Sequence, residues 1–305
     1  MTDRIKIGYF PGCSLASGSV DYSESVEAVS AAARVDLVEI PDWNCCGATC
    51  AHSVNKMLAL SLPARNLALA REAGLETLVV PCAGCYNRLA LVHHALTNSP
   101  DTLAQVETII ERPYDGKMRI MNAIEYASEI LLPRMNVKAG LLEGARFAPY
   151  YGCLLVRPPK VLAFDDPEDP VSMDVILRGL GADVVDWEYK VECCGGGHSL
   201  SRTDLVLPLA SKILAAARES GADAIVTACP MCHTNLDLRQ LDVKRVERLK
   251  DGMPVYYLTE VIGLAAGLDE KAIGVRRHFI NATGLRAKLA LRKSQPSPAK
   301  AGAGA

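Results

Sequence analysis

The chain has 305 residues, half of them hydrophobic, and a formal net charge of −2 at pH 7. This length allows two domains of ordinary size with buried cores. The charge balance excludes a broad positive field, so we expect no nucleic-acid partner. The first residues lack the apolar stretch of a secretory signal, and no run reaches the roughly 18 apolar residues of a membrane span. We therefore expect a cytoplasmic protein with reduced thiols.

In the first half of the chain, short β-rich runs alternate with stretches of helical periodicity. The predicted strands are 5–10, 37–41 and 77–80, and the predicted helices are 23–33, 54–73 and 86–96. This alternation is typical of parallel strands joined by crossover helices. Each predicted strand ends just before a cysteine group, where the ligand-binding loops of open α/β sheets gather.

The second half repeats this order one domain length later. The fold prediction is therefore α/β, with two pseudo-symmetric domains from an internal duplication. Each domain is expected to be a small, mostly parallel sheet with crossover helices and a cluster at its loop edge. The predicted domains are 1–138 and 139–290. The segment 291–305 has too little hydrophobicity to offset the entropy of ordering it, and it is predicted to be a disordered tail.

Ten of the eleven cysteines form two sets with the same internal order. In the first set, one cysteine is followed after 31 residues by an adjacent pair, and after 35 more by a CxxC group. In the second set the corresponding gaps are 39 and 34 residues. The first set is Cys13, Cys45, Cys46, Cys82 and Cys85, and the second set is Cys153, Cys193, Cys194, Cys229 and Cys232.

Thiolates are soft ligands that select zinc, copper(I) or iron–sulfur clusters. A structural zinc site needs only four ligands, which five cysteines per half exceed. An adjacent cysteine pair suits a cluster with several irons better than one small tetrahedral ion. Buried structural cysteines and a zinc scaffold remain the alternative interpretations of this pattern.

The motifs PGC, WNCCGA, PCAGC, YYGC, ECCGG and CPMC resemble those of the catalytic B subunit of heterodisulfide reductase, of the CCG-domain family, over about residues 5 to 270. The resemblance implies that each cysteine set holds a noncubane 4Fe-4S cluster. It also implies that the two clusters face one another where a disulfide is cleaved, each supplying one electron. All ten ligand positions of that family are present here.

The resemblance further implies an iron–sulfur C subunit and a flavin-bearing A subunit as partners in one complex. No flavin or nucleotide fingerprint is present in this chain, so electrons must come from such partners. The substrate would be a disulfide or a dithiol, which a carrier protein could present. The alternative function is a CCG-domain electron-transfer subunit of a quinone-linked oxidoreductase.

A few residues near the cysteine sets are further candidates. His198 follows three glycines after the second pair and is the predicted catalytic proton donor, because histidine exchanges protons near neutral pH. The roles of Cys50, the eleventh cysteine, and of His233, next to Cys232, stay open. Three basic residues are weaker candidates for binding an anionic substrate: Arg157, Lys160 and Arg202.

Overall fold

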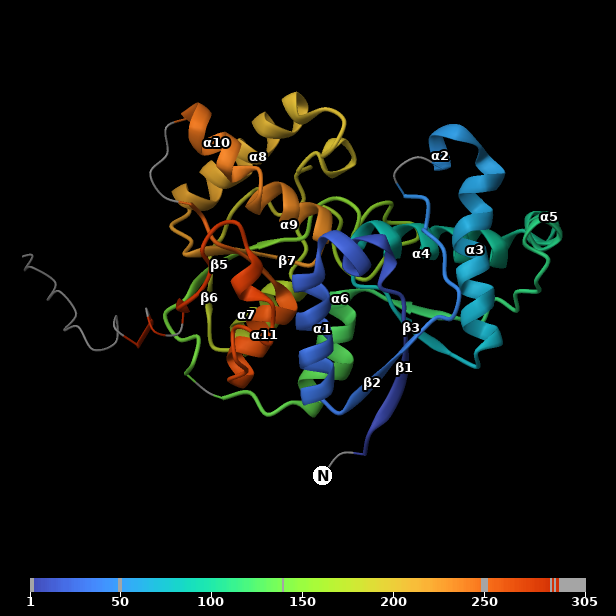
Figure 1. Ribbon diagram of the computed structural model, residues 1–305, viewed down its shortest axis with the longest axis horizontal. Coiled ribbons are helices and arrows are strands. Elements are labelled where there is room, and N and C mark those ends of the chain that lie inside the picture. Colours follow the sequence, from blue (N-terminus) through green and yellow to red (C-terminus); the bar gives the residue numbers. More distant parts are fainter. Residues whose placement is uncertain are drawn as a thin grey trace, which may run out of the picture.

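The computed structural model describes residues 3–48, 51–138, 140–247, 252–285, 287 and 289–290. Its framework is two four-stranded sheets, with strand orders β2-β1-β3-β4 and β6-β5-β7-β8 (Figure 1). All paired strands run parallel. The strands are β1 (Ile5–Tyr9), β2 (Val35–Glu39), β3 (Thr77–Val79), β4 (Arg119–Met121), β5 (Arg146–Tyr150), β6 (Asp183–Val184), β7 (Ala224–Thr227) and β8 (Val255–Tyr257).

Helices connect the strands in both halves, as the parallel topology requires. The helices of the first half are α1 (Val20–Ala32), α2 (Ala51–Val54), α3 (Lys56–Glu72), α4 (Ala83–Asn98), α5 (Pro100–Ile110) and α6 (Ala123–Tyr126). Those of the second half are α7 (Ser172–Gly179), α8 (Thr203–Glu219), α9 (Pro230–Asp237), α10 (Gln240–Glu247) and α11 (Leu258–Ala266). Short helical turns lie at η1 (Ser14–Gly18), η2 (Ala127–Leu131), η3 (Leu132–Arg134), η4 (Gly196–His198) and η5 (Val275–Arg277).

The predicted α/β fold with two pseudo-symmetric halves is confirmed. Three residues of the central strand β7, Ile225, Val226 and Thr227, are fully buried, as expected for a parallel strand with both faces covered. The predicted helix over 54–73 corresponds to α3, which begins two residues later, after Asn55. The Asn55 side chain accepts a hydrogen bond from the Leu58 amide (3.0 Å) and thereby caps the start of α3.

The fourth strand of each sheet, β4 and β8, was not predicted from the sequence. Each has only three residues, and no cysteine group follows it, whereas the equally short β3 leads into Cys82. Both strands lead directly into a helix whose first turn carries a glutamate, Glu125 in α6 and Glu260 in α11. Each glutamate accepts a hydrogen bond from the backbone amide three residues earlier, so the two strand-to-helix junctions have the same local geometry.

The two halves pack against each other through α1 and α11 (Figure 1). The Tyr22 ring stacks on that of Tyr257, with centroids 3.9 Å apart. The Ser25 and Thr259 hydroxyls are hydrogen-bonded at 2.6 Å. Both contacts are buried, so the interface between the halves is continuous with the core.

Two sequence predictions concern residues that the structure leaves undescribed. The predicted disordered tail 291–305 and Cys50 lie outside the described residues. The predicted domain boundary between residues 138 and 139 stays a prediction, because Ala139 is also outside the described residues. The Lys138 amide, just before it, donates to the Ala265 carbonyl of α11 (3.0 Å). None of the described helices is both long and apolar enough to cross a bilayer.

Candidate functional site

The first cysteine set lies at the carboxyl edge of the first sheet. Cys13 follows β1, the adjacent pair Cys45 and Cys46 follows β2, and Cys82 and Cys85 occupy the start of α4 after β3. Because β1, β2 and β3 are parallel neighbours, their ends deliver all five residues to one place. The Cys46 and Cys85 sulfurs are 3.2 Å apart.

The second set has the same arrangement on the second sheet. Cys153 follows β5, Cys193 and Cys194 follow β6, and Cys229 and Cys232 begin α9 after β7. The Cys194 and Cys232 sulfurs are 3.4 Å apart. The convergence that the strand-end positions predicted is therefore present in both halves, and all ten thiols are free.

Glycine is needed in the loops after β1 and β5, where the backbone passes close to a cysteine sulfur. Gly12 has φ +64°, and a Cβ there would lie 2.8 Å from the Cys85 sulfur. Gly152 has φ +66°, and a Cβ there would lie 3.0 Å from the Cys232 sulfur. Any other residue would combine a left-handed backbone with a contact too close for a carbon atom. The two glycines let the first loop of each half approach the cysteines of the third.

The thiols of each set share protons. A hydrogen bond from Cys45 lowers the pKa of Cys46 to about 3. In the second set, a hydrogen bond with Cys153 lowers the pKa of Cys193 to about 6. The donors have correspondingly raised pKa values, that of Cys45 through its bond to Cys46 and that of Cys153 through its bond to Cys193. Without a bound cation, only some of the thiols in each set can therefore lose their protons.

The two sets also touch each other. Hydrogen bonds from Cys232 and Cys82 lower the pKa of Cys229 well below its ordinary value. Since Cys82 belongs to the first half and Cys229 to the second, this contact joins the two sulfur groups across the interface between the halves. Groups bound at the two sets would be immediate neighbours.

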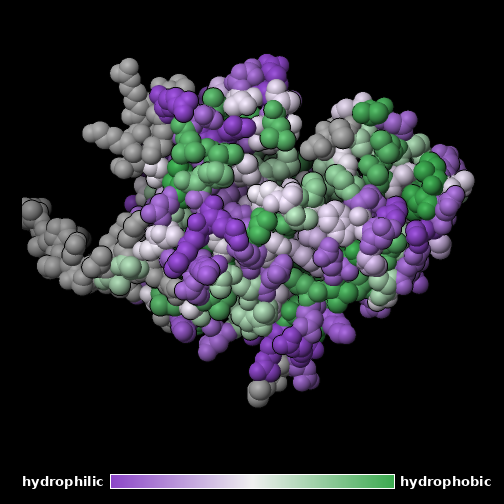
Figure 2. Space-filling view, in the orientation of Figure 1, coloured by the Kyte–Doolittle hydropathy of each residue, from purple (hydrophilic) through white to green (hydrophobic). Residues whose placement is uncertain are grey.

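A cavity of about 600 Å³ opens beside this contact. We call it the thiol cavity, because all five cysteines of the first set line it. Its opposite wall comes from the second half and includes Gly196, Ser199, Leu200 and Met231. Figure 2 shows the surface hollowed between α8 and α2, the helices that follow the second and the first cysteine pair. A small molecule can thus reach the first set while contacting both halves.

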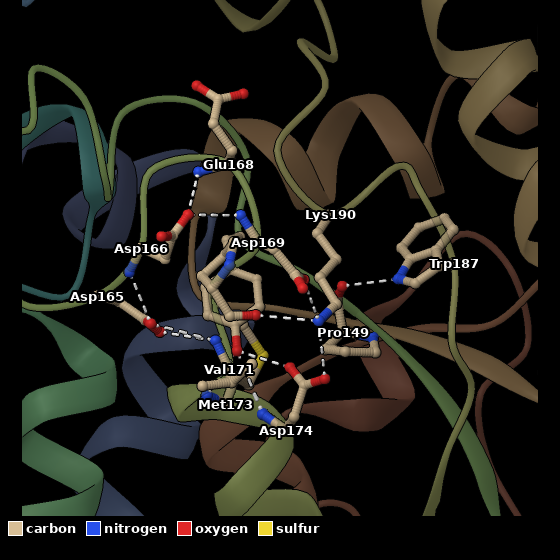
Figure 3. A network of polar contacts seen from close by, with 12 residues as sticks. Pro149, Asp165, Asp166, Glu168, Asp169, Val171, Met173, Asp174, Trp187 and Lys190 are labelled. Atoms are coloured by element: carbon tan, nitrogen blue, oxygen red, sulfur yellow. Dashed lines mark hydrogen bonds and ion pairs between the residues drawn. The ribbon is translucent and has the colours of Figure 1, made fainter.

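A buried lysine braces the second set (Figure 3). The Lys190 ammonium group contacts the carboxylates of Asp169 (2.9 Å) and Asp174 (3.1 Å). The Lys190 carbonyl accepts hydrogen bonds from the amides of Tyr151 and Gly152, next to Cys153. The network thereby fixes the segment before Cys193 against the loop that carries Cys153. Sequence reasoning missed it, because its partners are acidic residues on other elements.

An amide pair braces the first set. The buried Asn66 side chain of α3 accepts from the Asn44 amide (2.9 Å) and donates to the Asn44 carbonyl (2.8 Å). Asn44 immediately precedes Cys45, so α3 fixes the backbone that presents the first pair. A second amide, Asn235 of α9, donates to the Cys194 carbonyl (2.9 Å). These asparagines gave no signal in the sequence beyond their residue type.

The histidine and basic candidates lie in different surroundings. His198 is exposed in η4, and it contributes to lowering the pKa of Cys193 after the larger effect of Cys153, which places it within electrostatic reach of that thiol. His233 is buried and stacks on Tyr257. Arg157 pairs with Glu168 and Arg202 with Asp204, while Lys160 is exposed. None of these three basic residues is among the described residues that line the cavity beside the first cysteine set.

A comparison with protein-family models shows which family this chain belongs to. The cysteine-rich domain model called CCG matches residues 7–90 and 147–237, one copy in each half. The chain belongs to the CCG family. Each match contains one complete cysteine set, so the resemblance predicted from the cysteine motifs is confirmed.

Relatives of this CCG chain include subunits of two kinds of oxidoreductase. It is 31% identical, over 92% of its length and 99% of the relative's, to the 8-methylmenaquinol:fumarate reductase membrane anchor subunit of Wolinella succinogenes. It is 29% identical, over 93% of its length and 97% of the relative's, to the B subunit of a CoB-CoM heterodisulfide reductase of Methanosarcina acetivorans. A protein of Archaeoglobus profundus, named as similar to the heterodisulfide reductase B subunit, is 28% identical over 89% of this chain and 94% of its own length.

A solved structure shares the fold. The chain superposes on a hypothetical protein from Helicobacter pylori with a TM-score of 0.75 and 14% identity. The match covers 91% of this chain and 52% of that one, so this CCG chain spans about half of the solved chain. At this identity the likeness concerns the fold alone.

The donor sets fit iron–sulfur clusters. Each set offers five soft sulfur ligands, which exceeds what one tetrahedral zinc ion takes. Neighbouring thiols raise the pKa of Cys85 in the first set and of Cys232 in the second. Bound iron would lower these pKa values and favour the thiolates, because the metal supplies the positive charge that the surroundings lack. The Gly47 amide points at the Cys45 sulfur (3.4 Å) and the Gly195 amide at the Cys193 sulfur (3.3 Å), as expected for backbone donors to anionic sulfur.

Proposed function

We propose that this chain is the iron–sulfur subunit of a heterodisulfide reductase-like complex, and that it reduces a disulfide or oxidises two thiols. In this proposal each cysteine set holds one noncubane 4Fe-4S cluster. The observation that carries the proposal is the meeting of the two sets through Cys82 and Cys229 at the edge of the thiol cavity. A substrate in that cavity would have both redox groups within reach.

The electron count supports a pair of redox groups. Reduction of a disulfide consumes two electrons and two protons and releases two thiols, and the reverse reaction returns them. An iron–sulfur cluster exchanges one electron at a time, so two adjacent clusters together supply the pair. The electrons would come from partner subunits, an iron–sulfur C subunit and beyond it a flavin-bearing A subunit, because this chain has no nucleotide fingerprint.

The residues of the cavity have distinct tasks in this proposal. The first-set cysteines and the small residues Gly196 and Ser199 leave room for the substrate sulfurs beside the redox groups. Leu200 and Met231 contribute apolar surface that favours an organic substituent on the sulfur. His198, exposed near Cys193, would supply a proton to a departing thiolate.

A second function is favoured by one relative. The match to the methylmenaquinol:fumarate reductase subunit covers nearly the whole of both chains. Oxidation of a quinol likewise delivers two electrons and two protons, and two clusters would accept the electrons singly. In this alternative the thiol cavity would hold the quinol ring, and the chain would pass electrons to a quinone-linked oxidoreductase.

One assay separates the two functions. The cluster-loaded protein would be given a reduced viologen dye as electron donor and a panel of small disulfides, with thiol release and dye oxidation followed together. Two thiols released for every two dye electrons consumed would support the disulfide proposal. Absence of thiol release, together with reduction of a high-potential acceptor dye by a short-chain menaquinol in a separate assay, would replace it by the quinol alternative.

A further inference from the structure

A second polar cluster lies at the interface between the halves, apart from the cysteines. It joins Asp21 at the start of α1, His233 of α9 and His278 after η5. Each of the three offers one ligand atom, and these atoms all lie within 4.8 Å of one another. Glu260 of α11 adjoins them through a hydrogen bond to His278 (2.8 Å). We call these four residues the interface cluster.

His233 has the tautomer of a metal ligand. Its Nε2 lies 3.1 Å from the Val255 carbonyl, which can only accept, so Nε2 carries the proton. With Nε2 bonded to this carbonyl, Nδ1 is the ring nitrogen left for a metal. A backbone carbonyl on the far ring nitrogen is a common partner of metal-bound histidine.

His278 faces both acidic residues of the cluster. Its side chain is fully buried, and Nε2 bonds to the Glu260 carboxylate (2.8 Å) and lies 3.8 Å from the Asp21 carboxylate. Its Nδ1 is buried without a hydrogen-bond partner among the described residues. A buried ring nitrogen without a partner costs free energy unless something binds it.

The cluster has more acidic groups than basic ones. Asp21, Glu260 and Asp237 are carboxyl groups within this region, and desolvation raises the pKa of each, that of Glu260 to about 7. The neighbouring guanidinium of Arg277 is paired with Glu24. His278 is thus the group, among the residues that the structure describes here, that can offset the carboxylates. A bound divalent cation would supply the missing positive charge.

The first half lacks the corresponding groups. Tyr86 follows Cys85 at the position where His233 follows Cys232. Glu125 occupies the position of Glu260, and it lies beside Tyr86 rather than beside an imidazole. The duplicated fold therefore does not need histidine at this place. The second half has two imidazoles where the first half has a phenol.

Solvent reaches the interface cluster through its own cavity. This cavity has a volume of about 340 Å³, and its lining includes Asp21, His233 and Asp237. It adjoins the thiol cavity, since Ser17, Ser19 and Thr234 line both. A small ion and its remaining water ligands have both an entry path and room.

We propose that Asp21, His233 and His278 bind one first-row divalent metal ion, with the Glu260 carboxylate beside the His278 ring. Two imidazoles and one carboxylate suit Zn²⁺ or Fe²⁺, and the absence of thiolate ligands distinguishes this site from the cysteine sets. Because Asp21 comes from the first half and both histidines from the second, the ion would fasten the halves together. The proposal stands whether or not the proposed disulfide chemistry is correct.

Zinc binding to the cluster-loaded protein tests this site. After chelator treatment that leaves iron in place, Zn²⁺ would be titrated in competition with a chromophoric chelator. We expect one Zn²⁺ per chain, a rise in Tm on binding, and affinity reduced roughly tenfold or more in Asp21→Asn and His278→Gln. His94→Ala, which removes an exposed histidine of α4, should bind as the wild type does.

The iron content separates this site from zinc that has entered a cysteine set. Asp21→Asn should keep the iron of the wild type while losing the Zn²⁺. The proposal is overturned if the wild type binds no Zn²⁺ under these conditions. It is equally overturned if Asp21→Asn and His278→Gln bind Zn²⁺ as tightly as the wild type.

Discussion

The first and second halves keep the same strand order and the same order of cysteines, but they differ in how the cysteine loops are supported. After Cys13 the chain turns through η1 directly into α1. After Cys153 it runs through a long irregular segment before α7, and a buried lysine network holds that segment. Duplication has therefore preserved the sheet edge that presents the thiols, while the loops around them have diverged.

The halves also differ in what they show to a ligand. All five first-set cysteines line the thiol cavity, whereas the second half lines it with η4 and the start of α9. The second half in turn supplies both histidines of the interface cluster. The difference suggests a division of tasks, with the first set close to substrate and the second half forming the opposite wall. The predictions below test whether both halves are needed and where they diverge.

Loss of one cysteine from either half should have the largest effect. Cys45→Ser and Cys193→Ser should each remove about half of the iron and abolish turnover, because in the proposed function each set holds its own cluster and two electrons are required. Iron analysis and the dye assay measure both quantities. Cys50→Ser is the matched control and should retain full iron and at least half the activity. Normal turnover in either set variant would refute the need for two redox groups.

Removing the brace of the second set should cost about 3 kcal/mol of unfolding free energy. In Lys190→Met the Asp174 carboxylate, 3% exposed, stays buried without the cation at 3.1 Å and keeps the more distant guanidinium of Arg178 at 4.0 Å. We expect iron to be lost from the second set first, leaving about half. Chemical denaturation and iron analysis test this. The control is Arg119→Met, which breaks an exposed ion pair with Glu129 and should change stability by less than about 1 kcal/mol.

His198→Ala should lower the rate of disulfide reduction about 100-fold without loss of iron, because the variant lacks the proposed proton donor. Rate assays and iron analysis of the wild type and the variant under the same conditions check this expectation. An unchanged rate would show that His198 does not donate the proton.

The glycines beside the thiols should have matching effects in the two halves. Gly12→Ala and Gly152→Ala each combine a strained backbone, costing about 1 to 2 kcal/mol, with a methyl group against a cysteine sulfur. Each variant should therefore lose iron from its own set. Gly74→Ala has the same backbone strain (φ +72°) in open space. If all three variants kept the same iron content, the close approach to sulfur would be unimportant.

The sequence was sufficient for the parts of the molecule that depend on local pattern. Cysteines placed just after β-rich runs must meet when those strands are parallel neighbours, and both sets do meet. The short strands β4 and β8 were not predicted, because no cysteine group marks their ends as Cys82 marks that of β3. The start of α3 was predicted two residues early, because the capping role of Asn55 was not recognised.

The contacts between distant segments could not be predicted in this way. The interface cluster joins Asp21 to His278 across most of the chain, and neither residue belongs to a recognisable motif. Lys190 resembles any surface lysine in the sequence, yet the fold buries it beside Asp174. Such residues gain their roles only when the two sheets pack, since their partners come from other elements.

The metal content of the anaerobically purified protein tests the central claim most directly. Two five-thiol sets should hold two four-iron clusters, so we predict about eight irons and a similar amount of acid-labile sulfide per chain. Zinc should not exceed the single ion proposed for the interface cluster. Two or more zinc ions per chain with little iron would contradict the account, because the cysteine sets would then be zinc sites.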